Sequence, residues 1–327
     1  MVKFNIIRTG VISLAIVFAL IFGALTTEVD ARGWGSRDQD LFDNHSYQQS
    51  VTPRGSDAQM DVLDLEQGGK VFMRGNRRAS VHTYVAPDNF VTTHIIEGPR
   101  RLVVIDTQEI DLYATEVRDY IDSLGKPIDR VIISHSHPDH TGGLRLGLYE
   151  DAPVYALSDT ADALGAGVFG MDPVEIENII DLGQRRIAGL RFEFLQFDNA
   201  EDGAQLVVVL PGLNALIVQD LAYNSAHIFL GNAVPNNDPL ENWVDVLQIL
   251  LATQSQDWVL VGHGYPGDRS VLTENIKYLK TAIKVRARAA SFAEFQETMV
   301  EKFLHYDLEE VFFYGGFGFV VPYPPSE

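Results

Sequence analysis

Four side chains with metal-binding donor atoms fall within six consecutive residues of this chain. The segment SHSHPDHTGG, residues 134–143, contains His135, His137, Asp139 and His140. The whole chain of 327 residues has only nine histidines, so three within six positions is a marked concentration. A lone histidine is usually a surface or hydrogen-bonded core residue, whereas four donors together indicate a metal site.

The spacing of these donors predicts two neighbouring ion positions. Side chains at positions i and i+2 of an extended segment point the same way, so His135 and His137 can share one ion. Asp139 and His140 come after Pro138, where the chain turns, and can reach a second ion close by. Imidazole and carboxylate donors suit zinc, manganese or iron.

The elements before the cluster form a strand–helix–strand pattern. FVTTHIIEG (90–98) and RLVVID (101–106) read as strands, and EIDLYATEVRDYIDSLG (109–125) has the apolar spacing of a helix. DRVII (129–133) is a short apolar strand that leads directly into the cluster. Chemistry at the carboxyl end of the second strand of such a unit is typical of an α/β fold.

The second half of the chain also alternates between predicted strands and helices. Its predicted elements are a strand at PVYAL (153–157), a helix in two pieces over 159–182, three strands at 189–197, 204–210 and 214–220, a helix over 239–254, a last strand at DWVLV (257–261) and two further helices. An aromatic, glycine-rich tail, FFYGGFGFVVPYPP, ends the chain at residues 312–325.

The H-x-H-x-D-H pattern after a short apolar strand resembles the signature of the metallo-β-lactamase superfamily. The resemblance extends over residues 80–270: VVIDT precedes the motif, and three strands, an acid and a final GHG follow it. It implies an α/β fold, an αββα sandwich of two mixed β-sheets flanked by helices, with metals in the cleft between the sheets. It also implies a metal-dependent hydrolase.

The resemblance implies an unusual ligand after the motif. The family's next ligand is normally a histidine ten residues before the proline that ends the following strand; here that count from Pro211 gives Glu201, and no histidine lies between His140 and His227. The alkylsulfatase-like branch has the same replacement, in a Glu-Ala-Pro-Ala-Glu motif similar to EDGAQ here. Asp202 is the competing donor, and a surface-turn glutamate is the other alternative. We expect Asp202 to point away from Glu201, so that its loss has little effect.

The remaining ligands are implied by the ends of two later strands. Asp220 ends ALIVQD and corresponds to the bridging carboxylate, although Gln219 replaces the usual preceding glycine. The resulting assignment is His135, His137 and Glu201 for site 1, Asp139, His140 and His263 for site 2, and Asp220 as the bridge. Two divalent metal ions, Zn²⁺ in the first place and Mn²⁺ or Fe²⁺ as alternatives, would hold a hydroxide nucleophile between them.

Four residues are candidates for catalysis: Asp139, Asp220, Tyr223 and His227. Tyr223 lies three residues after Asp220, where lactonase-like members carry a tyrosine that donates to the substrate; a core tyrosine is the alternative. His227 lies seven residues after Asp220, where alkylsulfatases carry a histidine followed by asparagine. Ile228 replaces that asparagine here, so a sulfate-binding role does not follow directly.

The N-terminus has the three-part plan of a secretory signal peptide over residues 1–31. Lys3 and Arg8 precede an uncharged apolar run at 11–25, and Val29 and Ala31 provide the small residues of a cleavage site. The run is shorter than the roughly 20 residues of a membrane span. An uncleaved anchor is the alternative to a periplasmic or secreted protein without a stable membrane anchor.

After this segment we predict a flexible polar leader over 32–58 and a single domain over 59–327, including the C-terminal helices and tail. The 45 acidic residues against 25 basic ones give a net charge of −20, which disfavours nucleic acid and favours a small-molecule substrate. The absence of cysteine excludes disulfides, thiolate metal sites and a cysteine nucleophile.

The function predicted from these features is a secreted or periplasmic binuclear metal-dependent hydrolase. The bond attacked would be ester-like, in a sulfate ester, lactone, lactam or phosphate ester. The alternatives are a non-catalytic metal-binding protein with a decayed site and a one-iron oxygenase on the same fold. The sequence leaves the substrate, the native metal and the oligomeric state open.

Overall fold

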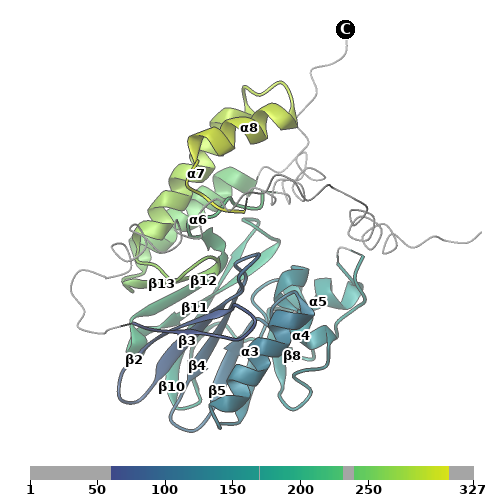
Figure 1. Ribbon diagram of the computed structural model, residues 1–327, viewed down its shortest axis with the longest axis vertical. Coiled ribbons are helices and arrows are strands. Elements are labelled where there is room, and N and C mark those ends of the chain that lie inside the picture. Colours follow the sequence, from purple (N-terminus) through teal and green to yellow (C-terminus); the bar gives the residue numbers. More distant parts are fainter. Residues whose placement is uncertain (1–59, 169, 231–238, 309–327) are drawn as a thin grey trace, which may run out of the picture.

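The computed structural model describes residues 60–168, 170–230 and 239–308. In these ranges two β-sheets lie face to face, and helices cover the outer face of each sheet (Figure 1). This order of layers confirms the predicted αββα sandwich of two mixed sheets. The predicted signal peptide, leader and aromatic tail lie outside the described residues.

The first sheet has eight strands that lie in sequence order. Strands β1 to β5 are antiparallel to their neighbours and β5 to β8 are parallel. The strands are β1 (Asp61–Asp64), β2 (Lys70–Gly75), β3 (Ser80–Val85), β4 (Thr92–Glu97), β5 (Leu102–Ile105), β6 (Ile128–Ile132), β7 (Val154–Ala156) and β8 (Asn178–Ile179). On its outer side lie α3 (Asp111–Ser123), α4 (Gly142–Arg145) and α5 (Ser158–Ala166) (Figure 1).

The second sheet has five strands in the order β13-β12-β11-β10-β9. Only the β12–β13 pair is parallel. The strands are β9 (Gly183–Ile187), β10 (Leu190–Asp198), β11 (Ala204–Leu210), β12 (Ala215–Tyr223) and β13 (Trp258–His263). The helices on this side are α6 (Pro239–Thr253), α7 (Ser270–Arg286) and α8 (Phe292–Lys302). None of the helices in the described ranges is both long and apolar enough to cross a bilayer.

Three layers of buried apolar side chains hold this sandwich together. Strand β11 is almost continuously apolar because both of its faces are buried. Val207 and Val209 belong to the core under the outer helices, while Leu206 and Val208 belong to the core between the sheets. Successive residues of a strand point to opposite faces. A strand that is covered on both faces therefore needs apolar residues at nearly every position.

The prediction of a two-piece helix over 159–182 is wrong in its second piece. Helix α5 ends at Ala166, and Gly167 follows with a φ of 78°, a left-handed conformation that glycine adopts without strain. Pro173 lies a few residues later and lacks the backbone N–H that a continuing helix would need. The chain then forms the short edge strand β8.

Candidate metal centre

The seven predicted metal ligands come from four segments of the chain. They lie at one end of the sandwich, at strand ends and in turns, except for Asp220, which lies within β12. His135 and His137 follow β6, Asp139 and His140 lie on the single turn η2 (Pro138–His140), Glu201 lies in the turn between β10 and β11, Asp220 lies on β12, and His263 ends β13. Both sheets therefore contribute to the site.

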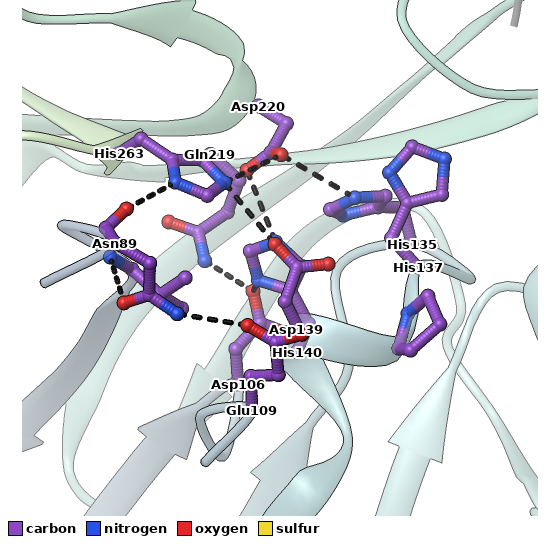
Figure 2. Close-up of polar contacts among 12 residues, drawn as sticks. Asn89, Asp106, Glu109, His135, His137, Asp139, His140, Gln219, Asp220 and His263 are labelled. Carbon is purple, nitrogen blue, oxygen red and sulfur yellow. Dashed lines mark hydrogen bonds and ion pairs between the residues drawn. The ribbon is translucent and has the colours of Figure 1, made fainter. Parts of the chain in front are cut away.

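The structure brings all seven side chains together as two groups that share Asp220. One group is His135, His137, Glu201 and Asp220, and the other is Asp139, His140, Asp220 and His263. Within each group one donor atom from every side chain lies within 4.8 Å of the others. Figure 2 shows Asp220 between His135 on one side and His263 on the other. This sharing is the arrangement expected of a bridging carboxylate.

Individual distances show how closely the donors approach. In the first group, His137 Nδ1 lies 3.1 Å from Glu201 Oε1, and His135 Nε2 lies 3.7 Å from Glu201 Oε2. In the second group, His263 Nε2 lies 3.1 Å from Asp139 Oδ2. The Glu201 side chain thus occupies the position that the residue count from Pro211 predicts, facing both histidines of the H-x-H pair.

Buried polar atoms without hydrogen-bond partners fit a bound cation here. Among the described residues, the atoms His135 Nε2, His140 Nε2 and Asp220 Oδ1 are buried and make no hydrogen bond, although His140 Nε2 and Asp220 Oδ1 lie 3.2 Å apart as an ion pair. A buried polar group that lacks a partner costs stability, so such atoms are uncommon in native proteins. Coordination to divalent ions would satisfy all three atoms, and the donor types are those that zinc, manganese and iron accept.

The outward-facing ring nitrogens of two histidines are held by acceptors. His140 Nδ1 lies 2.9 Å from Asp106 Oδ2, and His263 Nδ1 lies 2.9 Å from the backbone oxygen of Asn89. An acceptor at Nδ1 places the ring hydrogen there and leaves Nε2 as the electron-pair donor toward the cluster. Figure 2 shows the Asn89 contact on the side of the His263 ring that faces away from Asp220. This is the usual outer arrangement of metal-binding histidines.

Asp106 is a further buried anchor of the site, beyond the seven candidate ligands. It accepts from the Ser134 backbone N–H at 2.8 Å and from the Ser134 hydroxyl at 2.7 Å. It also accepts from the side-chain amide of Gln219. The Ser134 hydroxyl in turn lies 2.9 Å from His135 Nδ1. A sequence signal existed, because an acid directly after β5 must lie beside the end of its parallel neighbour β6.

The backbone of β12 is irregular beside Asp220. Gln219 has a φ of 45°, and the pairing of β12 with β13 shifts register on both sides of it. Few residues other than glycine adopt this conformation easily. Gly262 on β13 faces Asp220 so closely that a Cβ atom there would lie 1.7 Å from Asp220 Oδ1. Residue 262 must therefore be glycine for Asp220 to keep this position.

The electrostatic field of the site favours positive charge. Burial opposes protonation of His137 and His263, yet Glu201 raises the pKa of His137 to about 9 and Asp220 raises that of His263 to about 10. Burial also raises the pKa of Glu201, since a carboxylate in this enclosed place lacks solvent. Without a bound cation, the carboxylates thus stabilise the protonated histidines. The same negative potential would stabilise bound divalent ions.

Asp202 belongs to neither donor group, but it holds the motif loop. Its Oδ2 accepts from the Ser136 backbone N–H at 3.1 Å and from the Ser136 hydroxyl at 2.6 Å. Ser136 lies between His135 and His137. Asp202 therefore binds Ser136 and joins no donor group. Because of this contact we expect its loss to have an effect, contrary to the prediction from the sequence.

The two further catalytic candidates lie in different surroundings. The Tyr223 hydroxyl donates to Asp220 Oδ2 at 3.0 Å, and its ring stacks on that of His263 with centroids 4.7 Å apart. His227 is outside both donor groups, and its Nδ1 lies 2.9 Å from the hydroxyl of Tyr278 on α7. Tyr223 thus contacts the centre directly. The catalytic roles of both residues stay predictions.

Comparison with known proteins identifies the family and the fold. The profile of the Metallo-beta-lactamase superfamily matches residues 86–263, which include all seven candidate ligands. Among solved structures, a metallo-beta-lactamase from Pontibacter korlensis is 20% identical, with a TM-score of 0.51 over 68% of this chain and 99% of that chain. The DIM-1 metallo-beta-lactamase is 19% identical, with a TM-score of 0.53 over 68% of this chain and 100% of that chain.

At these identities the structural likeness shows the fold alone, and no curated protein sequence matches this chain. The match to the superfamily profile, however, covers more than half of the chain, and the matched range includes all seven candidate ligands. The chain therefore belongs to the metallo-beta-lactamase superfamily, whose members are mostly metal-dependent hydrolases.

Proposed function

We propose that this chain is a binuclear hydrolase that adds water across an ester-like bond of a small molecule. The observation that carries the proposal is the pair of donor groups sharing Asp220. A site for one ion would need only one of these groups. The seven candidate ligands in two groups instead fit two ions side by side. Asp106 forms a further group with His135 and His140, but its Oδ2 contacts His140 Nδ1, the ring nitrogen that faces away from Asp220.

The residues divide between the two ions as the distances suggest. His135, His137 and Glu201 would hold one ion, Asp139, His140 and His263 the other, and Asp220 both. Divalent ions in such a pair supply Lewis acidity and lower the pKa of a coordinated water toward about 7. Zinc suits the imidazole-rich donor set, and the three carboxylates also accommodate manganese or iron.

Tyr223 is the residue that we assign to the substrate oxygen. Its hydroxyl already donates to a carboxylate of the centre, and burial together with Asp220 holds its pKa well above the usual range. It therefore remains a proton donor at neutral pH. A donor at this place can stabilise negative charge as it develops on the oxygen under attack.

The overall reaction is hydrolysis of a lactone, lactam, sulfate ester or phosphate ester. The bond between the carbonyl, sulfur or phosphorus centre and its leaving atom breaks, the hydroxyl of water joins that centre, and a proton goes to the leaving atom. The net charge of −20 disfavours polyanionic substrates such as nucleic acid. The N-terminal segment supports a periplasmic or secreted location.

Elemental analysis of the purified protein tests the proposal. Wild-type protein and the Asp198→Ala variant, which changes an exposed carboxylate on β10, should hold close to two ions per chain. Asp220→Ala should lose metal, and chelator-treated wild type should lose hydrolysis of whichever of the four ester-like substrate classes the untreated protein cleaves. One iron ion per chain would instead favour an oxygenase, and reproducible absence of metal would favour a decayed site.

A further inference from the structure

Gln205 is a fully buried polar side chain beside site 1. It is the only polar residue of β11, whose sequence is AQLVVVL, and it is 0% exposed. Its amide nitrogen Nε2 donates a hydrogen bond to Glu201 Oε2. Its carbonyl oxygen Oε1 has no hydrogen-bond partner among the described residues. An amide in an apolar strand, with one hydrogen bond directed at one carboxylate, calls for an explanation.

The two residues lie on one hairpin whose backbone is already fixed. Asp198 of β10 pairs with Ala204 of β11, and the Asn199 N–H donates to the Gly203 oxygen at 3.1 Å to close the turn. Glu201 lies at the tip of this turn. The turn sets where Glu201 starts, but the direction of its carboxylate still depends on the rotation of its side chain. The hydrogen bond from Gln205 restricts that direction at Oε2, while His137 Nδ1 lies 3.1 Å from Oε1.

The chemical type of Gln205 matches what a carboxylate ligand needs. The histidines His140 and His263 are oriented by acceptors, since each ring has a second nitrogen that donates. Glu201 can only accept, so a partner that orients it must be a donor. The amide of Gln205 is a neutral donor, and it orients Glu201 without cancelling the negative charge that binds the cation.

We infer that Gln205 is a positioning residue of site 1: it fixes the carboxylate of Glu201 in the plane that faces His135 and His137. The inference rests on the proposed binuclear function. It adds to that function a residue that touches neither metal nor substrate. It also explains why a glutamate can stand where relatives of the family carry histidine, because the matching donor lies four residues further along the same hairpin.

The test compares Gln205→Met with Gln205→Glu by measuring metal affinity against a competing chelator. Gln205→Met keeps a similar side-chain volume and removes the hydrogen-bond donor. The affinity for one of the two Zn²⁺ ions should fall by about 10- to 100-fold, while the affinity for the other stays near that of wild type. Gln205→Glu donates only when its carboxyl is protonated, so its affinity relative to wild type should fall as the pH rises. The matched control is Gln256→Met, a buried glutamine before β13, which should leave both affinities unchanged.

The outcomes separate this inference from the proposed function. Wild-type protein that binds fewer than two ions overturns the binuclear function itself. Wild type with two ions and Gln205→Met with unchanged affinities, whatever its thermal stability, overturns only the role of Gln205. If Gln205→Met does not fold, the pH series decides: a ratio of Gln205→Glu to wild-type affinity that does not vary with pH overturns the inference.

Discussion

Replacing Asp202 by alanine should weaken metal binding although Asp202 is not a ligand. The two hydrogen bonds that it accepts from Ser136 are the contacts that join the β10–β11 turn to the segment between His135 and His137. Without them the motif loop is held at its start by Asp106 but loses this support at its centre. We therefore expect Asp202→Ala to disturb site 1 more than site 2.

The size of the effect follows from the nature of these bonds. Hydrogen bonds to a charged group contribute about 1.5–3 kcal/mol each to the stability of the fold. A buried donor that is left without an acceptor lowers the stability further. Ser136 is only 5% exposed, but Asp202 is partly accessible, so water can replace part of the loss. We expect the free energy of unfolding of metal-free protein to fall by about 1–3 kcal/mol. Affinity for the site-1 ion should fall by about 10- to 100-fold.

Chelator competition with Zn²⁺ and thermal unfolding of the metal-free protein measure these two quantities. Asp202→Asn keeps an acceptor oxygen for Ser136 and should lose less than Asp202→Ala. Asp198→Ala, on the same hairpin but exposed, is the control for a simple loss of negative charge. Asp202→Ala with wild-type affinity for both ions would show that the turn holds the loop by other means and that the reasoning is mistaken.

Three other perturbations have defined outcomes. Glu201→Ala should lose the site-1 ion by elemental analysis, whereas Glu201→His should keep two and lower the pH optimum of hydrolysis, because a less negative site makes coordinated water more acidic. In metal-free protein, the raised pKa values of His137 and His263 mean that the protonated rings stabilise the fold below about pH 6.5; this stability should disappear as the pH rises through about 9 to 10, which thermal unfolding across pH measures. N-terminal sequencing of exported protein should begin near Arg32, and an intact Met1 would contradict cleavage.

Much of the fold was predictable because its strands are covered on both sides. The apolar runs at β5, β6, β11, β12 and β13 stand out in the sequence. β5, β6, β12 and β13 each end at or close to a candidate ligand or anchor residue, and β11 begins three residues after Glu201. Edge strands were not predictable in the same way. Strand β9, GQRRI, buries only Ile187, and β1 is exposed throughout, so neither has a periodicity that distinguishes it from a loop.

The candidate ligands could be brought together from the sequence because they are tied to strand ends and to a dense motif. Each of the seven lies at or beside the predicted place, and the structure brings them together. The residues that orient the candidate ligands differ in this respect. Asp106 could be placed from its position directly after β5, the parallel neighbour of β6. Asn89 could not, because it contacts His263, which lies 174 residues further along the chain. A motif records which residues bind, whereas orientation depends on tertiary contacts.

Two departures from the family pattern argue against a decayed site. Gln219 stands in place of a glycine and adopts a backbone conformation that is unfavourable for its type, yet its amide donates to Asp106. Glu201 stands in place of a histidine and accepts from Gln205. A site that no longer binds metal would accumulate substitutions without partners, leaving buried carboxylates with nothing to stabilise them. Here each substituted residue has a partner of matching hydrogen-bond type, which is expected if selection still maintains the geometry of the donors.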